Sequence, residues 1–290
     1  MLCVAVLFAF QPRSAVAQTP PSAAQFYTAA LEATKHLESP PIVTYTAKIQ
    51  AKGAEVTVAR DPHTHHVVFF ESIGPHENPA TSYIIGYRFD QDVSDISVGG
   101  KYLGQSPRAI FDPTWQGVYD WLTFGSNGEP ARLLKKRALP LHPVASKTAA
   151  PLKTIAILSA MGSSIYAIRD GGAAICPNGD IGHQLITSAR RNPSFHPLLG
   201  VIVDLKTGVF CSLRFRVTGS GPMVGITGYA EEHFASVGKY WLATDLSIED
   251  DVRVAGIALH HVSVNVAYTD MAFPSHLPPV ALPTPAHENR

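Results

Sequence analysis

Regular alternation of apolar and polar residues constrains the fold of this chain more than any other feature. Segment 209–217 has an apolar side chain at every odd position, and segment 262–268 has one at every even position. A period of two residues is that of a β-strand with one buried and one solvated face. Similar segments recur along the chain with short turns between them, which predicts antiparallel hairpins.

We expect about a dozen strands, and the composition agrees. Gly and Pro number 22 and 23 in 290 residues, which favours short strands and turns over a helical bundle. Turns are expected at Lys52-Gly53 and at Asp61-Pro62. The expected strands span residues 43–49, 56–58, 67–70, 83–89, 96–98, 153–159, 163–169, 182–190, 200–205, 209–217, 223–229, 239–249 and 253–268.

Two helices are predicted between and before these strands. Ser22 and Gln25 have the spacing of a capping box, and an apolar stripe follows them until Ser39-Pro40-Pro41. Asp112-Pro113 predicts the start of a second helix that ends at Gly125. Because the helices do not alternate with the strands, the sequence favours an α+β, mainly antiparallel β fold: a large curled sheet or incomplete barrel packed over two helices.

The two ends of the chain differ from its middle. Residues 1–17 combine an apolar run with an Ala15-Val16-Ala17 cleavage site, which predicts a signal peptide and a periplasmic or secreted protein. The apolar run is too short for a permanent membrane span. Residues 18–273 form one β-rich domain, and 129–151 is a proline-punctuated stretch that fits either an insertion or linker, or a crossing loop. Residues 274–290 are a proline-rich tail.

Charge and motif content argue against several functions. Lys and Arg (23) balance Asp and Glu (23), so the chain has no net positive charge that would attract nucleic acid. No zinc pattern surrounds the histidines of 63–66 or His260-His261, so no metal or other cofactor is expected. No G-x-S-x-G nucleophile motif occurs, and nothing in the sequence favours a triad assembled from distant residues. The chain is predicted not to be an enzyme.

Cys176 and Cys211 remain after the predicted cleavage. In an oxidising compartment an isolated pair tends to form a disulfide. The two residues lie in elements that are not consecutive, so two buried thiols are the alternative.

Aromatic residues are the candidates for ligand contact. Trp115, Tyr119 and Trp121 give the second predicted helix more apolar area than one packing contact uses, and Tyr45 and Phe69 lie in early strands. These five side chains either line a hydrophobic hollow or fill the core.

The order of elements, together with the hairpin sequence from Ile202 to Gly208, resembles the periplasmic lipoprotein-carrier superfamily of the LolA/LolB type. The resemblance implies an incomplete barrel around helices, an apolar concavity that receives acyl chains, and no enzymatic activity. This chain is longer than the carriers, and their binding residues are not matched, so no lipoprotein handover is implied. The expected function is binding of a lipid or other apolar small molecule; the alternative is an envelope structural or interaction module that contacts a protein partner without a ligand.

Overall fold

The computed structural model describes residues 21–60, 67–88, 93–106, 112–115, 118, 161–193, 196–220, 224–255 and 257–277. In this part of the chain one helix precedes eleven strands. The elements are α1 (Ala23–Lys35), β1 (Ile42–Arg60), β2 (Val67–Arg88), β3 (Val93–Val98), β4 (Lys101–Ser106), β5 (Tyr166–Ile175), β6 (Ile181–Ala189), β7 (Leu198–Asp204), β8 (Phe210–Ser220), β9 (Val224–Val237), β10 (Tyr240–Val254) and β11 (Ile257–Ala272).

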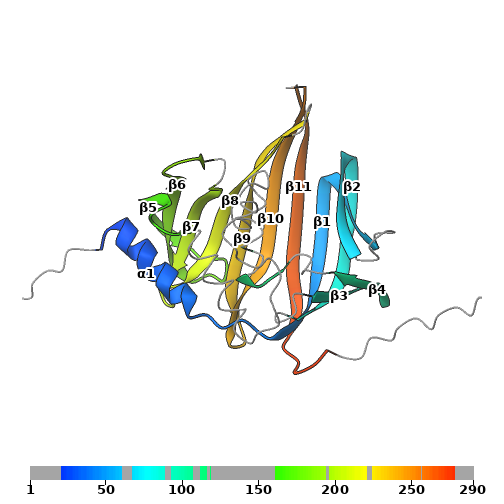
Figure 1. Ribbon diagram of the computed structural model, residues 1–290, viewed down its shortest axis with the longest axis horizontal. Coiled ribbons are helices and arrows are strands. Elements are labelled where there is room, and N and C mark those ends of the chain that lie inside the picture. The colour runs from blue at the N-terminus through cyan, green and yellow to red at the C-terminus, as the bar shows by residue number, and fades with distance from the viewer. Residues whose placement is uncertain are drawn as a thin grey trace, which may run out of the picture.

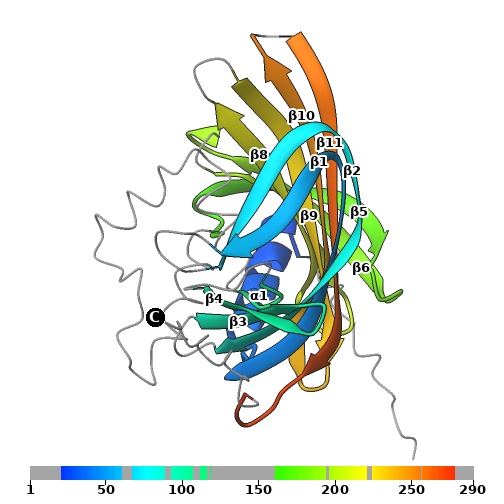
Figure 2. The ribbon, with the colours of Figure 1, turned by 90° about the vertical axis from the view of Figure 1, so that its right-hand side faces the viewer.

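All eleven strands belong to one antiparallel sheet (Figure 1), in the order β4-β3-β2-β1-β11-β10-β9-β8-β7-β6-β5. Consecutive strands are neighbours in the sheet, except that β4 and β5 lie at its opposite edges; β11, the last strand, pairs with β1. The edges, β4 and β5, do not pair with each other, so the described sheet is open. Figure 2 shows that the sheet curls, with α1 on its concave side.

Helix α1 forms where the sequence predicts it. Ser22 is the N-cap, and the capping box is complete: the Gln25 amide donates to Ser22 Oγ, and the Ser22 amide donates to Gln25 Oε1. Tyr27 and Leu31 are buried on the face that meets the sheet, and the Tyr27 hydroxyl donates to the Met161 carbonyl at 2.7 Å. The packing of α1 is concentrated on β5 and β8.

The concave face is mostly apolar over the middle of the sheet, from β6 to β1. Residues that pair directly across neighbouring strands form a single buried row over seven strands. The row consists of Leu185, Val201, Leu213, Glu232, Leu246, Val266 and Ile49. Six of its members are aliphatic, and Glu232 is the exception. Side chains one position along each strand face the convex, solvated side.

The turn expected at Lys52-Gly53 is wrong, because β1 continues through it. Gly53 has φ +74°, and the β1–β2 register shifts between Lys52 and Ala54, as in a β-bulge. A Cβ at Gly53 would lie 2.2 Å from the His261 carbonyl oxygen, so glycine is required there. The strands expected at 67–70 and 83–89 are likewise joined in the single strand β2.

The curled antiparallel sheet is confirmed, whereas the expected count of two helices is not. The described residues contain one helix, and of the second helix only 112–115 and 118 are described. The signal peptide, the strand at 153–159, the 129–151 stretch and most of the proline-rich tail lie outside the described residues. No helix in the described ranges is long and apolar enough to cross a membrane.

Candidate functional site

The part of the concave face that lies away from α1 holds a buried group of polar and aromatic side chains. Tyr45 on β1 and Tyr268 on β11 are in edge-to-face contact, with ring centroids 6.0 Å apart. Glu232 on β9 and Asp112, from the segment after β4, are also buried. We call Tyr45, Asp112, Glu232 and Tyr268 the tyrosine–carboxylate cluster.

Two contacts fix the segment that carries Asp112. The Ala243 amide on β10 donates to the Pro113 carbonyl at 2.7 Å, next to a register shift between Ala243 and Asp245. Trp115 stacks on Phe234 of β9, with ring centroids 4.8 Å apart and planes 8° from parallel. Phe234 is two residues from Glu232 and therefore on the same face of β9. The aromatic pair Trp115–Phe234 thus adjoins the cluster.

The electrostatics of the cluster keep its tyrosines protonated. Burial raises the pKa of Tyr45 well above its ordinary value, and the charge of Asp112 adds to the rise. Burial also raises the pKa of Tyr268, with further contributions from Glu232, Tyr45 and Asp112. Both hydroxyls therefore remain hydrogen-bond donors at any physiological pH. Trp115 Nε1 is a third buried donor, and it has no hydrogen-bond partner within the described ranges.

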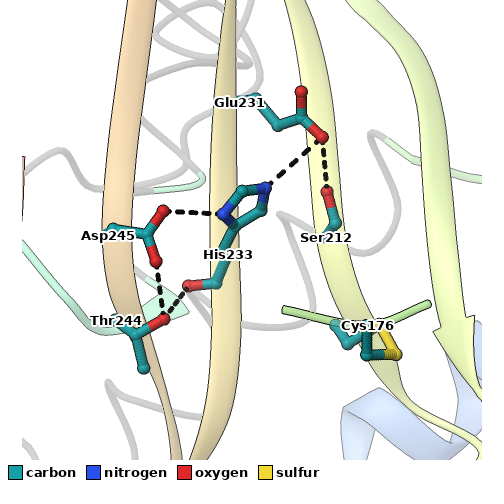
Figure 3. Close-up of polar contacts among 7 residues, drawn as sticks. Cys176, Ser212, Glu231, His233, Thr244 and Asp245 are labelled. Carbon is teal, nitrogen blue, oxygen red and sulfur yellow. Dashed lines mark hydrogen bonds and ion pairs between the residues drawn. A yellow bond between two sulfur atoms is a disulfide. The ribbon is translucent and has the colours of Figure 1, made fainter. Parts of the chain in front are cut away.

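The convex face carries a different polar network, shown in Figure 3. His233 Nδ1 lies 2.6 Å from Asp245 Oδ1, and its Nε2 lies 3.4 Å from Glu231 Oε1. Ser212 Oγ donates to Glu231 Oε1 at 3.1 Å, and Thr244 Oγ1 donates to Asp245 Oδ2 at 2.9 Å. The network spans β8, β9 and β10.

This network contains serine, histidine and acid, but not in the order of a hydrolase triad. A triad needs a serine hydroxyl bonded to a neutral histidine, whereas the Ser212 hydroxyl donates to Glu231. Burial lowers the pKa of His233, but hydrogen bonds and charges from Asp245 and Glu231 outweigh it and raise the pKa to about 9. A histidine that holds its proton at neutral pH is not a general base.

Because of the His233 network, the free energy of unfolding should decrease at alkaline pH. Because the folded-state pKa of about 9 exceeds the ordinary 6.5, the stabilisation is complete below pH 6.5 and is lost as the pH rises through 9. We expect the free energy of unfolding to fall by about 1–2 kcal/mol between neutral pH and about pH 10, allowing for solvent screening at half-exposed Asp245.

Urea unfolding at several pH values measures this loss. His233→Gln should abolish the alkaline decrease, and His260→Gln, an exposed control on β11, should retain it. An alkaline decrease of the same size in His233→Gln would show that other groups cause it.

The structure brings together two of the five predicted ligand-contact residues. Tyr45 (1% exposed) and Trp115 (4% exposed) both lie at the buried group on the concave face. Phe69 belongs to β2, but its side chain is outside the described part, as are Tyr119 and Trp121. The sequence did not predict Glu232, Tyr268 or Phe234 as members of this buried group. The signal for Glu232 was weak, because the Glu231-Glu232 pair interrupts the alternation of its strand.

Cys176 and Cys211 are joined in a disulfide, with Cα atoms 5.8 Å apart. The bond ties the end of β5 to β8 across β6 and β7. Gly182 makes the approach feasible, since a Cβ there would lie 3.1 Å from Cys176 Sγ and 2.7 Å from Ile202 Cγ2. Of the histidines, those of 63–66 are outside the described residues, and no group of side chains suited to a metal ion occurs within the described ranges.

No protein-family model and no curated protein matches this sequence. Several solved structures are similar over most of their length, and three of them are described here. A DUF1329 family protein from Desulfovibrio piger is 8% identical with a TM-score of 0.33, covering 89% of this chain and 96% of its own. An outer membrane lipoprotein-sorting protein domain from Vibrio parahaemolyticus is 11% identical with a TM-score of 0.32, and the match covers 87% of this chain and 93% of that domain. A LolA superfamily protein from Nitrosomonas europaea is 8% identical with a TM-score of 0.28, and the match covers 87% of this chain and 94% of that protein.

Proposed function

We propose that this protein is an exported, non-enzymatic carrier that binds an apolar molecule, such as a lipid acyl chain, against the concave face of its sheet. The observation that carries the proposal is that the apolar concave face is wider than the part of it that α1 covers. The buried aliphatic row crosses seven strands, whereas α1 packs mainly on β5 and β8. The concave face over β9, β10, β11 and β1 therefore has apolar area that α1 alone does not cover.

Burial of apolar area would supply the affinity. Each methylene of an acyl chain contributes about 0.8 kcal/mol when it leaves water, so a long chain binds without specific chemistry. The polar end of the ligand would be oriented by the donors at this face: the Tyr268 hydroxyl and Trp115 Nε1.

Export is part of the proposal, and two features support it. The sequence of residues 1–17 has the form of a signal peptide. The Cys176–Cys211 disulfide suits a periplasmic or extracellular compartment, where oxidation is favoured.

Titration with a fluorescent fatty acid tests the proposal. The wild-type protein should bind the probe, and Trp115→Ala should weaken binding at least about tenfold because it removes the aromatic surface on Phe234. Leu31→Ala is the matched control: it also truncates a buried side chain, but under α1. Absence of probe binding by the wild type, or equal weakening in the control, would contradict the carrier proposal.

One observation favours the alternative, an envelope interaction module without a ligand. The concave-face residues of β1 are already buried by the chain itself; Val43, Ala47 and Ala54 are fully inaccessible. If the concave face binds no ligand, the fatty-acid probe will not bind, and cross-linking in cells should instead capture a protein partner.

A further inference from the structure

Carboxylate side chains interrupt the otherwise apolar concave face of the sheet. Glu232 on β9 is 1% exposed and pairs across the strands with Leu213 and Leu246. Asp250 on β10 follows Leu246 by four residues in an unbroken register, so it shares the same face. Asp112, in the segment after β4, is also buried. The middle of the concave face is therefore acidic as well as apolar.

The backbone accommodates two of these carboxylates. Gly228 on β9 is the direct partner of Asp250, and a Cβ at Gly228 would lie 2.1 Å from Asp250 Oδ1. Any other residue at this position would collide with the carboxylate. Asp112 is oriented by the Thr114 amide, which donates to Asp112 Oδ1 at 2.8 Å. Both acidic side chains are thus built into the fold at this face.

The acidic side chains act on the tyrosine beside them. Burial raises the pKa of Tyr268, and the charges of Glu232, Asp112 and Asp245 add to the rise. These charges disfavour a negative charge on the Tyr268 oxygen, and they would disfavour any other anion brought to the same place. Because the group is buried, water would screen this repulsion only weakly. The region around Tyr268 is therefore unfavourable for a carboxylate or a phosphate.

The same region offers hydrogen-bond donors. Trp115 is 4% exposed, and its Nε1 has no hydrogen-bond partner among the described residues. Its ring stacks on Phe234, which lies two residues from Glu232 on the concave face of β9. The Tyr268 hydroxyl, which keeps its proton at physiological pH, is a second donor. Buried donors are normally paired with an acceptor, so a ligand at this face should supply one.

We propose that the ligand is an acyl lipid with an uncharged polar end, whose ester or amide carbonyl accepts the hydrogen bonds, and that Glu232 and Asp112 select against lipids with an anionic end. This inference rests on the carrier function proposed above and specifies the class of its ligand. A free fatty acid binds through its chain, but its carboxylate lowers the affinity. A cationic amine would suit the acidic side chains, yet it offers Trp115 Nε1 no acceptor.

Titration at neutral pH with three pyrene-labelled probes of equal chain length tests this proposal: a fatty acid, its methyl ester and the corresponding alkyl amine. The wild-type protein should bind the ester about tenfold more tightly than the acid, and the amine no more tightly than the ester. Glu232→Gln keeps the shape of the side chain and removes its charge, so it should bring the affinity for the acid to within about twofold of that for the ester. Glu231→Gln is the matched control, because it removes the same charge from the convex face of the same strand, and it should keep the tenfold difference.

The comparison of probes in the wild type needs no variant, so it decides the matter even if Glu232→Gln does not fold. Binding of the acid as tightly as the ester would overturn the uncharged ligand class while leaving the carrier function intact. Tightest binding of the amine would overturn it in favour of a cationic ligand. An equal loss of selectivity in Glu231→Gln would show that Glu232 does not determine it. Failure of all three probes to bind would overturn the carrier function itself, and the ligand class with it.

Discussion

Phe234→Ala should lower the free energy of unfolding by about 3–5 kcal/mol, the range for truncating a buried phenylalanine. Phe234 is fully buried on the concave face of β9, and its ring stacks on Trp115 at 4.8 Å. Removing the ring leaves a cavity and deprives the segment after β4 of its aromatic contact with the sheet. The loss should therefore exceed that of an isolated core truncation without stacking.

Urea unfolding followed by circular dichroism measures this change. Ile257→Ala is the control, because its side chain is 67% exposed and its truncation should stay within about 0.5 kcal/mol of the wild type. A loss below about 1 kcal/mol in Phe234→Ala would show that the Trp115–Phe234 contact does not hold this segment to the sheet.

Removing the disulfide should have an effect of similar size. Cys176 and Cys211 are 35 residues apart in sequence, and closing a loop of that length constrains the unfolded chain by about 3–4 kcal/mol. The variant with Cys176→Ser and Cys211→Ser should thus unfold at lower urea concentration and lower temperature than the oxidised protein.

The reduced wild type is the matched control for this pair of substitutions. Dithiothreitol should lower its stability to that of the double variant and should leave the double variant unchanged. Two reactive thiols from Cys176 and Cys211 in the unreduced, denatured protein would contradict the disulfide.

The general architecture could be predicted because it depends on local patterns. The odd apolar positions of 209–217 are buried from Val209 to Phe215, although Phe210 and Ser212, beside a register shift, are buried too. The capping box at Ser22 and Gln25 is purely local and was likewise predictable. The turn predicted at Gly53 was wrong because a glycine with positive φ occurs in bulges as well as in turns. Only the close approach of the His261 carbonyl shows that Gly53 lies in a bulge.

The buried group on the concave face was harder to predict, for two physical reasons. Glu232 occupies an inward position in an otherwise aliphatic row, so the pattern of β9 appears to end at Tyr229, eight residues before the strand does. The contacts of Asp112 and Trp115 depend on where the segment after β4 crosses the sheet, and strand order is not encoded in local alternation. The Cys176–Cys211 pairing also depends on strand order, because it bridges two intervening strands.

The central claim is that the concave face holds an apolar guest, and mass spectrometry of the purified protein tests it most directly. Solvent extraction of protein isolated from an envelope fraction should release a lipid in an amount comparable to the protein, and Trp115→Ala should release clearly less. An extract free of lipid, from protein that also fails to take up a fluorescent fatty acid, would contradict the claim and leave an exported scaffold.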